Sequence, residues 1–449
     1  RLNRLAAVES KPYSPASFGE TFARDAESSF QSCLRFNIGG IVHCITRFRT
    51  FFVLLLLPIA SLHAADVLQI RDGDRILLIG STTIEREQSY GYWETALYAA
   101  KPDVNFSVRN LGWSGDTVWS ESRAGFETPE YGFKELQKLV ETLQPTLIVV
   151  NYGFNESFAG EPGLAKFRDG LKRLTEMLSA TKARIVLVSP TRMEYRSDKF
   201  PDHTADNRNI ELYRDAIRDF AAEHQFGFGD WTDSVIPPAG STPLSSKHAL
   251  TDNGLHLTED GYRKTASALS DLAGASPPEH KLVVDVAAKT VTGFAEATDF
   301  SYSDSLSFTA TSKQLAFPND LHSLTNAPLR YVVSGLKAGT EYWMHLDGSP
   351  ILYATGKQWA SGISIGLNQD SEQVEELRQT ILRKNELFFY RWRPQNVTYL
   401  FGFRKHEQGQ NAKEVAEFEP LVQEQDRLID ELKKPRPHKY EFIPKDENK

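Results

Sequence analysis

Cysteine is almost missing from this 449-residue chain, which has only Cys33 and Cys44, both near its beginning. A disulfide framework, a thiol nucleophile or a zinc site made of cysteines is therefore excluded for the rest of the chain. Long apolar runs are missing as well. The most apolar stretch, residues 51–60, has about ten residues, whereas a membrane-spanning helix requires roughly 20.

Positive charge is not in excess either, with 51 Lys and Arg against 59 Asp and Glu and a formal net charge of -8. A protein that binds phosphate backbones is usually basic, so we expect no nucleic-acid partner. The sequence also has no His-Glu-x-x-His motif, no P-loop and no complete Gly-x-Gly-x-x-Gly motif. We therefore expect neither a metal nor a cofactor. The hydrophobic content of 40% and charged content of 24% are typical of a folded globular protein.

Residues 42–65 have the order of features typical of a secretory signal peptide. Arg47 and Arg49 precede the apolar run 51–60, and small residues follow at Ala64 and Ala65. We expect cleavage after one of these alanines, and hence an exported protein, periplasmic or secreted, without a stable membrane span. A retained membrane anchor is the alternative. Residues 1–41 precede this signal, and we interpret them as a doubtful upstream extension.

Short apolar runs alternate with longer amphipathic stretches over residues 66–275. Continuous apolar character indicates strands that are buried on both faces, and strand–helix alternation indicates a parallel sheet between two helical layers. We therefore predict an α/β fold, a three-layer α/β/α sandwich of the flavodoxin-like kind. The expected strands are residues 75–80, 105–110, 146–150, 184–188 and, more weakly, 226–228, and the expected helices are 129–143, 164–180, 205–224 and 260–272.

The pattern changes after residue 275. Residues 276–370 are rich in Val, Thr, Ser and aromatic residues, which indicates a small β-rich module. Within it, residues 329–333 and 341–346 are expected to form a meander, and Asn319-Asp320 and Asp347-Gly348 are turn signals. Residues 371–449 are predicted to form a helical and aromatic C-terminal region that ends in a mobile tail rich in Lys and Pro.

Polar and glycine residues follow the apolar runs, at the strand ends where ligands bind in parallel sheets. Four such segments are Gly80-Ser81-Thr82, Gly112-Trp113-Ser114-Gly115, Gly153-Phe154-Asn155-Glu156 and Asp252-Asn253-Gly254-Leu255-His256. In this order they resemble the four sequence blocks of the SGNH (GDSL-type) hydrolase superfamily, and the resemblance extends over residues 73–272. It implies an exported bacterial ester hydrolase with an extra C-terminal region.

The resemblance implies a role for four residues. Thr82 stands where the family has its nucleophilic serine, His256 where it has the general base, and Gly115 and Asn155 where it has oxyanion-hole donors. The chemistry requires these residue types, because a hydroxyl needs an imidazole to take its proton and the oxyanion of the intermediate needs fixed donors.

Two positions depart from the family pattern. The nucleophile is a threonine rather than a serine, and neighbouring Ser81 is the alternative nucleophile. The position three residues before the histidine, where the family has aspartate, is Asn253, with Asp252 one step further away. An amide can orient the imidazole, but it cannot stabilise an imidazolium as a carboxylate does. Either Asn253 or Asp252 is expected to orient His256.

The C-terminal region has a dense aromatic and polar segment around Arg391 and Trp392. Aromatic planes beside guanidinium and amide groups are used in sugar recognition, which makes these two residues candidates for the substrate rim. The alternative is an aromatic contact that docks this region onto the hydrolase domain.

These patterns predict an exported ester hydrolase that deacylates a carbohydrate or a small-molecule ester. The competing hypothesis is a catalytically degenerate glycan-binding or scaffold protein that has kept the fold. The weakened nucleophile and acid positions are the reason to keep it open.

Overall fold

A computed structural model of the chain describes residues 66–196, 199–238, 249–275, 278–318, 328–366 and 369–445. The predicted extension 1–41, the predicted signal 42–65 and both cysteines lie outside the described residues. The turn signal at Asn319-Asp320 also lies outside them.

A parallel five-stranded sheet forms the centre of the first part of the chain, with the strand order β2-β1-β3-β4-β5. Every predicted strand is present, with ends within one residue of the expected ones, and the predicted fold class is confirmed. The central strands are buried because both faces of the sheet are covered. The strands are β1 (Asp74–Gly80), β2 (Phe106–Asn110), β3 (Leu147–Asn151), β4 (Arg184–Val188) and β5 (Gly227–Gly229).

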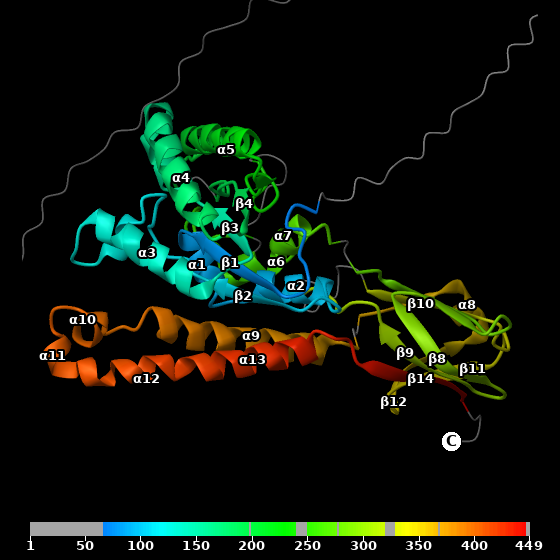
Figure 1. The fold of residues 1–449 in the computed structure, drawn as a ribbon. Helices are drawn as coiled ribbons and strands as arrows, with labels where there is room; N and C mark the ends of the chain where they lie inside the picture. The colour runs from blue at the N-terminus through cyan, green and yellow to red at the C-terminus, as the bar shows by residue number, and fades with distance from the viewer. Residues whose placement is uncertain are drawn as a thin grey trace, which may run out of the picture. The chain divides into compact units, whose positions relative to one another are not determined.

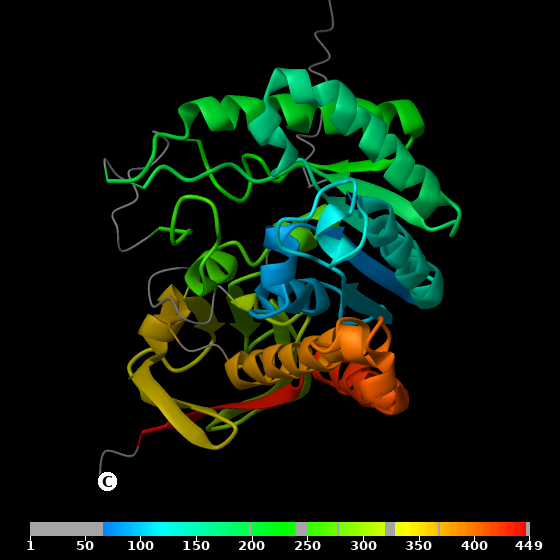
Figure 2. The ribbon, with the colours of Figure 1, turned by 90° about the vertical axis from the view of Figure 1, so that its left-hand side faces the viewer.

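Helices cover both faces of this sheet, as Figures 1 and 2 show. Alternate side chains of β1 enter different cores: Ile76 and Leu78 pack on one face, Leu77 and Ile79 on the other. The first core includes α1 (Thr82–Glu87), α2 (Tyr92–Ala100), α6 (Glu259–Lys264) and α7 (Ala268–Leu272). The second core includes α3 (Pro129–Leu143), α4 (Leu164–Ser179) and α5 (Thr204–His224). The sheet is therefore the middle layer of a sandwich.

A helical hairpin from the C-terminal region packs along edge strand β2. Its arms α9 (Ser371–Trp392) and α13 (Phe418–Leu432) lie side by side (Figure 1). Short helices connect them: α10 (Val397–Leu400), α11 (Lys405–Gln408) and α12 (Ala412–Ala416). Buried Lys384 on α9 donates to the carbonyl of Val108 at 3.0 Å and forms an ion pair with buried Glu94. The hairpin thus covers this sheet edge and supplies a donor to the Val108 carbonyl, a group of the kind that an open edge leaves unpaired.

The β-rich module contains two further sheets, with the orders β13-β10-β6-β7 and β12-β11-β14-β9-β8. Figure 1 shows most of its strands in yellow-green. It also includes the short helix α8 (Gly356–Ser361). The strands are β6 (Lys281–Asp285), β7 (Thr290–Gly293), β8 (Ala295–Tyr302), β9 (Leu306–Ser312), β10 (Leu329–Ser334), β11 (Glu341–Leu346), β12 (Ser349–Thr355), β13 (Ile363–Ile365) and β14 (Pro437–Pro444).

Two sequence predictions about this module are wrong. The expected meander does not form, because β10 and β11 belong to different sheets. The expected mobile tail contains β14, which pairs with both β11 and β9 and buries Tyr440 and Phe442. The predicted turn at Asp347-Gly348 is confirmed. It joins β11 to β12 with a positive φ at both residues, as a two-residue hairpin turn requires.

Candidate active site

The alcohol of Thr82 lies at the carboxyl end of β1, on the first residue of α1. Its Oγ1 accepts a 3.3 Å hydrogen bond from the backbone N–H of Gly115. Ser81 precedes it as the N-cap residue of α1, and its side chain is buried, with 5% of the residue exposed. Thr82 is only half-buried. Each of the two neighbouring hydroxyls contacts a candidate oxyanion donor, Thr82 that of Gly115 and Ser81 that of Asn155 at 2.8 Å. They differ in access, because Ser81 is buried and Thr82 is not.

Two glycines shape the loop that follows β2. Gly115 has a φ of 75°, in the left-handed region that favours glycine. Gly112 lies so close to α1 that an added Cβ would stand 2.3 Å from the backbone nitrogen of Glu85. This close approach brings the loop against the helix that carries Thr82. The resemblance pointed to Gly115, whereas the need for glycine at 112 is visible only in three dimensions.

A buried trio braces the same loop. Arg123 Nε lies 2.7 Å from Asp116 Oδ2, and the Tyr152 hydroxyl donates to that oxygen at 2.8 Å. Arg123 also donates to the carbonyl of Leu111 at 2.7 Å. Burial lowers the pKa of Arg123, but Tyr152 and Asp116 outweigh this and raise it overall, so the guanidinium stays charged. The loop around Gly115 is therefore rigidly held by residues that the sequence analysis did not single out.

Asn155, after β3, connects the three strand ends. Its Nδ2 donates to Ser81 Oγ at 2.8 Å and to the carbonyl of Asp116 at 2.7 Å. Both hydrogens of the amide are thus used within the protein. To hold a substrate oxyanion, Asn155 would exchange one of these partners for the substrate oxygen.

Glu156 braces the loop next to Asn155. Its two carboxylate oxygens accept the N–H groups of Val118 at 2.8 Å and Gly153 at 2.9 Å. Burial raises the pKa of Glu156 to about 7, more than these hydrogen bonds lower it. The loops after β2 and β3 are therefore joined by a group that titrates near neutral pH.

His256 lies in the loop before α6, with Asn253 beside its ring. Asn253 Oδ1 accepts the N–H groups of Leu255 at 3.0 Å and His256 at 2.9 Å, which fixes the orientation of the amide. Asn253 Nδ2 consequently faces His256 Nδ1, at 3.3 Å. An amide nitrogen can only donate, so this contact requires Nδ1 to accept and places the ring hydrogen on Nε2. That tautomer cannot take a proton at Nε2.

Helix α1 anchors the His256 loop. Arg86 donates to the carbonyl of Leu257 at 3.2 Å and lies 3.6 Å from Asp252, and the Tyr262 hydroxyl donates to the carbonyl of Thr83 at 2.6 Å. The pKa of His256 is lowered, first by burial and then by the charge of Arg86, while Asp252 opposes the shift. Among the described residues, no hydrogen bond joins His256 to Thr82. Such bonds are often formed only with substrate bound.

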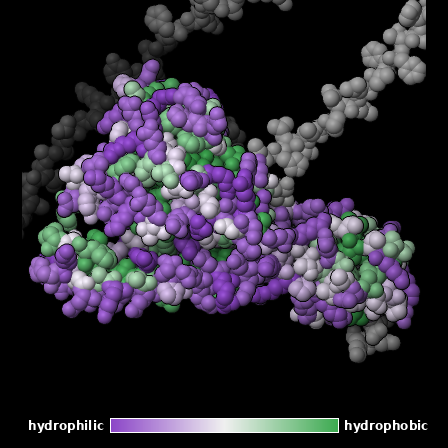
Figure 3. Space-filling model, viewed as in Figure 1, coloured by the Kyte–Doolittle hydropathy of each residue, from purple (hydrophilic) through white to green (hydrophobic). Residues whose placement is uncertain are grey.

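The two candidate rim residues lie at the end of α9. Trp392 packs against Trp113 of the loop after β2, with ring centroids 5.8 Å apart, and Arg391 lies 3.9 Å from Glu419 on α13. Beyond them, apolar side chains of the hairpin tip reach the surface visible in Figure 3; the exposed ones are Val397, Phe401 and Phe403. Trp392 thus joins the hairpin to the hydrolase loops, and Arg391 joins the two arms of the hairpin.

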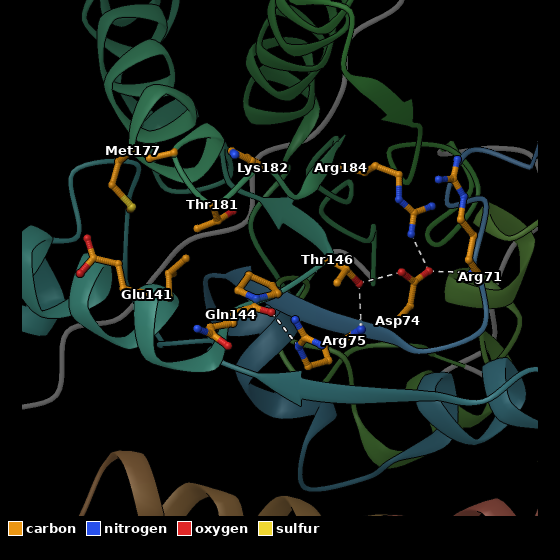
Figure 4. A pocket seen from close by; sticks show the side chains of 13 residues that line it. Arg71, Asp74, Arg75, Glu141, Gln144, Thr146, Met177, Thr181, Lys182 and Arg184 are labelled. Carbon is orange, nitrogen blue, oxygen red and sulfur yellow. Dashed lines mark hydrogen bonds and ion pairs between the residues drawn. The ribbon is translucent and has the colours of Figure 1, made fainter.

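A hollow of about 610 Å³ lies away from these residues, at the amino ends of the strands (Figure 4). Its buried carboxylate, Asp74, is already engaged by Thr146 at 2.7 Å and by Arg184. Arg75 Nε donates to the carbonyl of Gln144 at 2.7 Å. These charged groups that line the hollow are therefore already paired within the protein, which indicates a structural role for them. In the part of the chain that the structure describes, no cluster of His, Cys, Asp and Glu could hold a metal ion, and no helix is long and apolar enough to span a bilayer.

Comparison with known proteins gives a family for this region. The sequence model of the GDSL-like Lipase/Acylhydrolase family matches residues 77–264. No curated protein matches the sequence of the chain.

The chain is also similar to solved structures. A gut microbial diltiazem-metabolizing enzyme, BT4096, is 15% identical, with a TM-score of 0.63 over 84% of this chain and 99% of that chain. A catalytic mutant of Axe2, an acetylxylan esterase from Geobacillus stearothermophilus, is 18% identical, with a TM-score of 0.37 over 46% and 97%. A GDSL-like lipase from Bacteroides thetaiotaomicron is also 18% identical, with a TM-score of 0.32 over 44% and 87%.

The extent of the first likeness shows that the fold shared with BT4096 goes well beyond the sandwich. The family match covers the blocks that carry Thr82, Gly115, Asn155 and His256. Residues 77–264 of this chain are thus a GDSL-like lipase/acylhydrolase domain, a member of the SGNH hydrolase superfamily.

Proposed function

We propose that this protein is an exported carboxylic ester hydrolase that removes a short acyl group from a carbohydrate. The observation that supports this most strongly is the position of the Thr82 alcohol, 3.3 Å from the N–H of Gly115. A nucleophile beside a fixed backbone donor is the arrangement that acyl transfer requires, because the oxyanion forms on the same carbon atom that the nucleophile attacks.

In the proposed reaction, the ring hydrogen of His256 first moves from Nε2 to Nδ1. Thr82 Oγ1 then attacks the ester carbonyl while His256 Nε2 takes its proton. The N–H groups of Gly115 and Thr82, with Asn155, hold the oxyanion. His256 then gives its proton to the leaving alcohol, and water releases the acyl group from Thr82 by the reverse sequence. The greater access of Thr82 supports its role over that of buried Ser81.

Exposed aromatic rings on the same loops support a carbohydrate substrate. Phe126 follows the loop that carries Gly115 and is 90% exposed, and Phe158 follows Asn155 and is 57% exposed. Aromatic planes stack on sugar rings. The ring of Phe158 packs edge-on against Phe154, with centroids 6.0 Å apart, and more than half of its surface stays open to solvent. We expect Phe158→Ala to raise KM for acetylated oligosaccharides and to leave KM for p-nitrophenyl acetate unchanged. Equal effects on both substrates would remove the support for a carbohydrate.

The experiment that tests the reaction is hydrolysis of p-nitrophenyl acetate and of acetylated oligosaccharides by purified protein. We expect Thr82→Ala to abolish turnover of both, and Thr82→Ser to retain it, because serine supplies the same hydroxyl without the methyl group. Unchanged turnover in Thr82→Ala would refute the assignment. Ser81→Ala serves as the matched control and should remain active.

One observation favours the competing function, a glycan-binding protein without catalysis. The amide of Asn253 faces Nδ1 of His256 and selects the tautomer that cannot act as a base. That function predicts glycan binding with no release of acetate, and binding that weakens in Trp392→Ala or Arg391→Ala. Release of acetate that depends on Thr82 would exclude it.

A further inference from the structure

The C-terminal hairpin places a cation against both segments that meet at Thr82. Arg393 directly follows α9, and its Nη1 lies 2.6 Å from Glu85 Oε1. Its guanidinium carbon lies 3.4 Å from the ring centroid of Trp113. Glu85 belongs to α1 and Trp113 to the loop of Gly115. One side chain from the end of the hairpin therefore contacts the helix of the proposed nucleophile and the loop of the proposed oxyanion donor.

Glu85 also binds the backbone of the loop that carries Gly115. Its second oxygen, Oε2, accepts the N–H of Ser114 at 2.6 Å, and the next N–H along the chain, that of Gly115, points at Thr82 Oγ1. Glu85 thus fixes the peptide unit that immediately precedes the donor. The side chain of Glu85 is only 17% exposed, so its negative charge needs a partner close by, and Arg393 supplies it.

The hairpin has further anchors away from Arg393. Lys384 of α9 forms a buried pair with Glu94 of α2, and Asp426 of α13 pairs with Arg109 of β2 at 2.5 Å. Removing the charge of Arg393 therefore leaves these anchors in place. We expect the substitution to change the structure only at the end of the hairpin that lies beside the loop after β2.

We propose that Arg393 is a positioning residue of the ester-hydrolysing site. It holds Glu85, and through Glu85 it holds the Ser114–Gly115 backbone in register with Thr82. This inference rests on the proposed function, and it makes the C-terminal hairpin a working part of the active centre.

The test compares three purified full-length variants: Arg393→Met, Arg393→Lys and, as a control on the same helix, Arg383→Met. Arg383 is exposed and pairs with Glu386 one turn away, at 2.5 Å. Complete loss of an oxyanion donor costs about 10²–10³ in kcat, so a displaced donor is expected to cost about 10–100-fold. We expect this fall in kcat for p-nitrophenyl acetate in Arg393→Met with KM within about twofold, partial recovery in Arg393→Lys, and wild-type values in Arg383→Met.

A second measurement does not depend on turnover. Hydrogen exchange of the peptide that covers residues 111–118 is expected to be faster in Arg393→Met and unchanged over β3. Glu85→Gln should have the same effect as Arg393→Met, and the double variant should be no worse than either, because the two side chains act in series.

Wild-type kcat and unchanged exchange in a folded Arg393→Met would overturn the positioning role, and additive effects of the two substitutions would do so as well. These failures are distinguishable from failure of the proposed function. In that case, Thr82→Ala would hydrolyse the ester as fast as the wild type, whatever Arg393 does.

Discussion

Replacing Asn253 with aspartate is expected to increase ester hydrolysis, because it changes which ring nitrogen of His256 carries the hydrogen. The amide oxygen of Asn253 is held by two backbone N–H groups, so its nitrogen faces Nδ1 at 3.3 Å. A carboxylate would keep these two backbone hydrogen bonds with one oxygen. Its other oxygen would accept an Nδ1–H, which frees Nε2 to take the proton of Thr82.

The size of the effect has two bounds. The lower bound comes from the hydrogen bond that holds the unproductive tautomer of His256. A neutral hydrogen bond is worth about 0.5–1.5 kcal/mol, so its loss alone gives about a 2- to 10-fold gain. The upper bound comes from serine proteases, where amide in place of carboxylate costs about 10⁴ in kcat, or roughly 5 kcal/mol. We expect kcat to rise between about 2- and 10⁴-fold in Asn253→Asp.

The assay is the initial rate of p-nitrophenyl acetate hydrolysis against pH, with circular dichroism and urea unfolding as checks on the fold. The added carboxylate should also raise the pKa of His256 and move the acid limb of kcat/KM to higher pH. Asp252→Asn is the matched control. A folded Asn253→Asp variant with unchanged or lower kcat, together with a large loss in Asp252→Asn, would refute the reasoning and assign the orienting role to Asp252.

Three other perturbations follow from the buried charges. Burial raises the pKa of Glu156 from 4.5 to about 7, so the folded state binds this proton more tightly than the unfolded state. The free energy of unfolding is therefore expected to fall by about 3 kcal/mol as pH rises between these values. Glu156→Gln should remove this fall in a series of urea unfolding curves, and an unchanged pH slope would contradict the prediction. Lys384→Met leaves Glu94 buried and unpaired and should cost about 3–5 kcal/mol, most of it recovered when Glu94 is also replaced by Met. Since the charge of Arg86 lowers the pKa of His256, Arg86→Gln should move the acid limb of kcat/KM to higher pH; a shift to lower pH would show that Arg86 acts in another way.

The sandwich could be predicted from the sequence, because each of its strands is a continuous apolar run. Such a run can be recognised without knowing which strands it pairs with. Strand β14 could not be found in this way. Its neighbourhood is rich in Lys and Pro, and its partners β9 and β11 lie far away in the sequence, so only tertiary pairing reveals it. The prediction of a meander was wrong for the same reason, because the consecutive strands β10 and β11 belong to different sheets.

Part of the candidate site was also predictable. Thr82, Gly115, Asn155 and His256 were recognisable because each stands in a short block at a strand end. The residues that hold these blocks were not recognisable. Arg393 stands in the aromatic segment that the sequence marks as a candidate rim, but nothing local distinguishes it from Arg391. Its contacts with α1 and the loop after β2 arise only when the hairpin packs on β2.

The most direct test of the account is to identify the residue that carries the acyl group during turnover. Acid quenching of the protein during hydrolysis of p-nitrophenyl acetate, followed by tandem mass spectrometry, is expected to place an acetyl group on Thr82. The same experiment should find none in His256→Ala. Turnover with the acetyl group on Ser81, or with no acetylated residue at this strand end, would contradict the account.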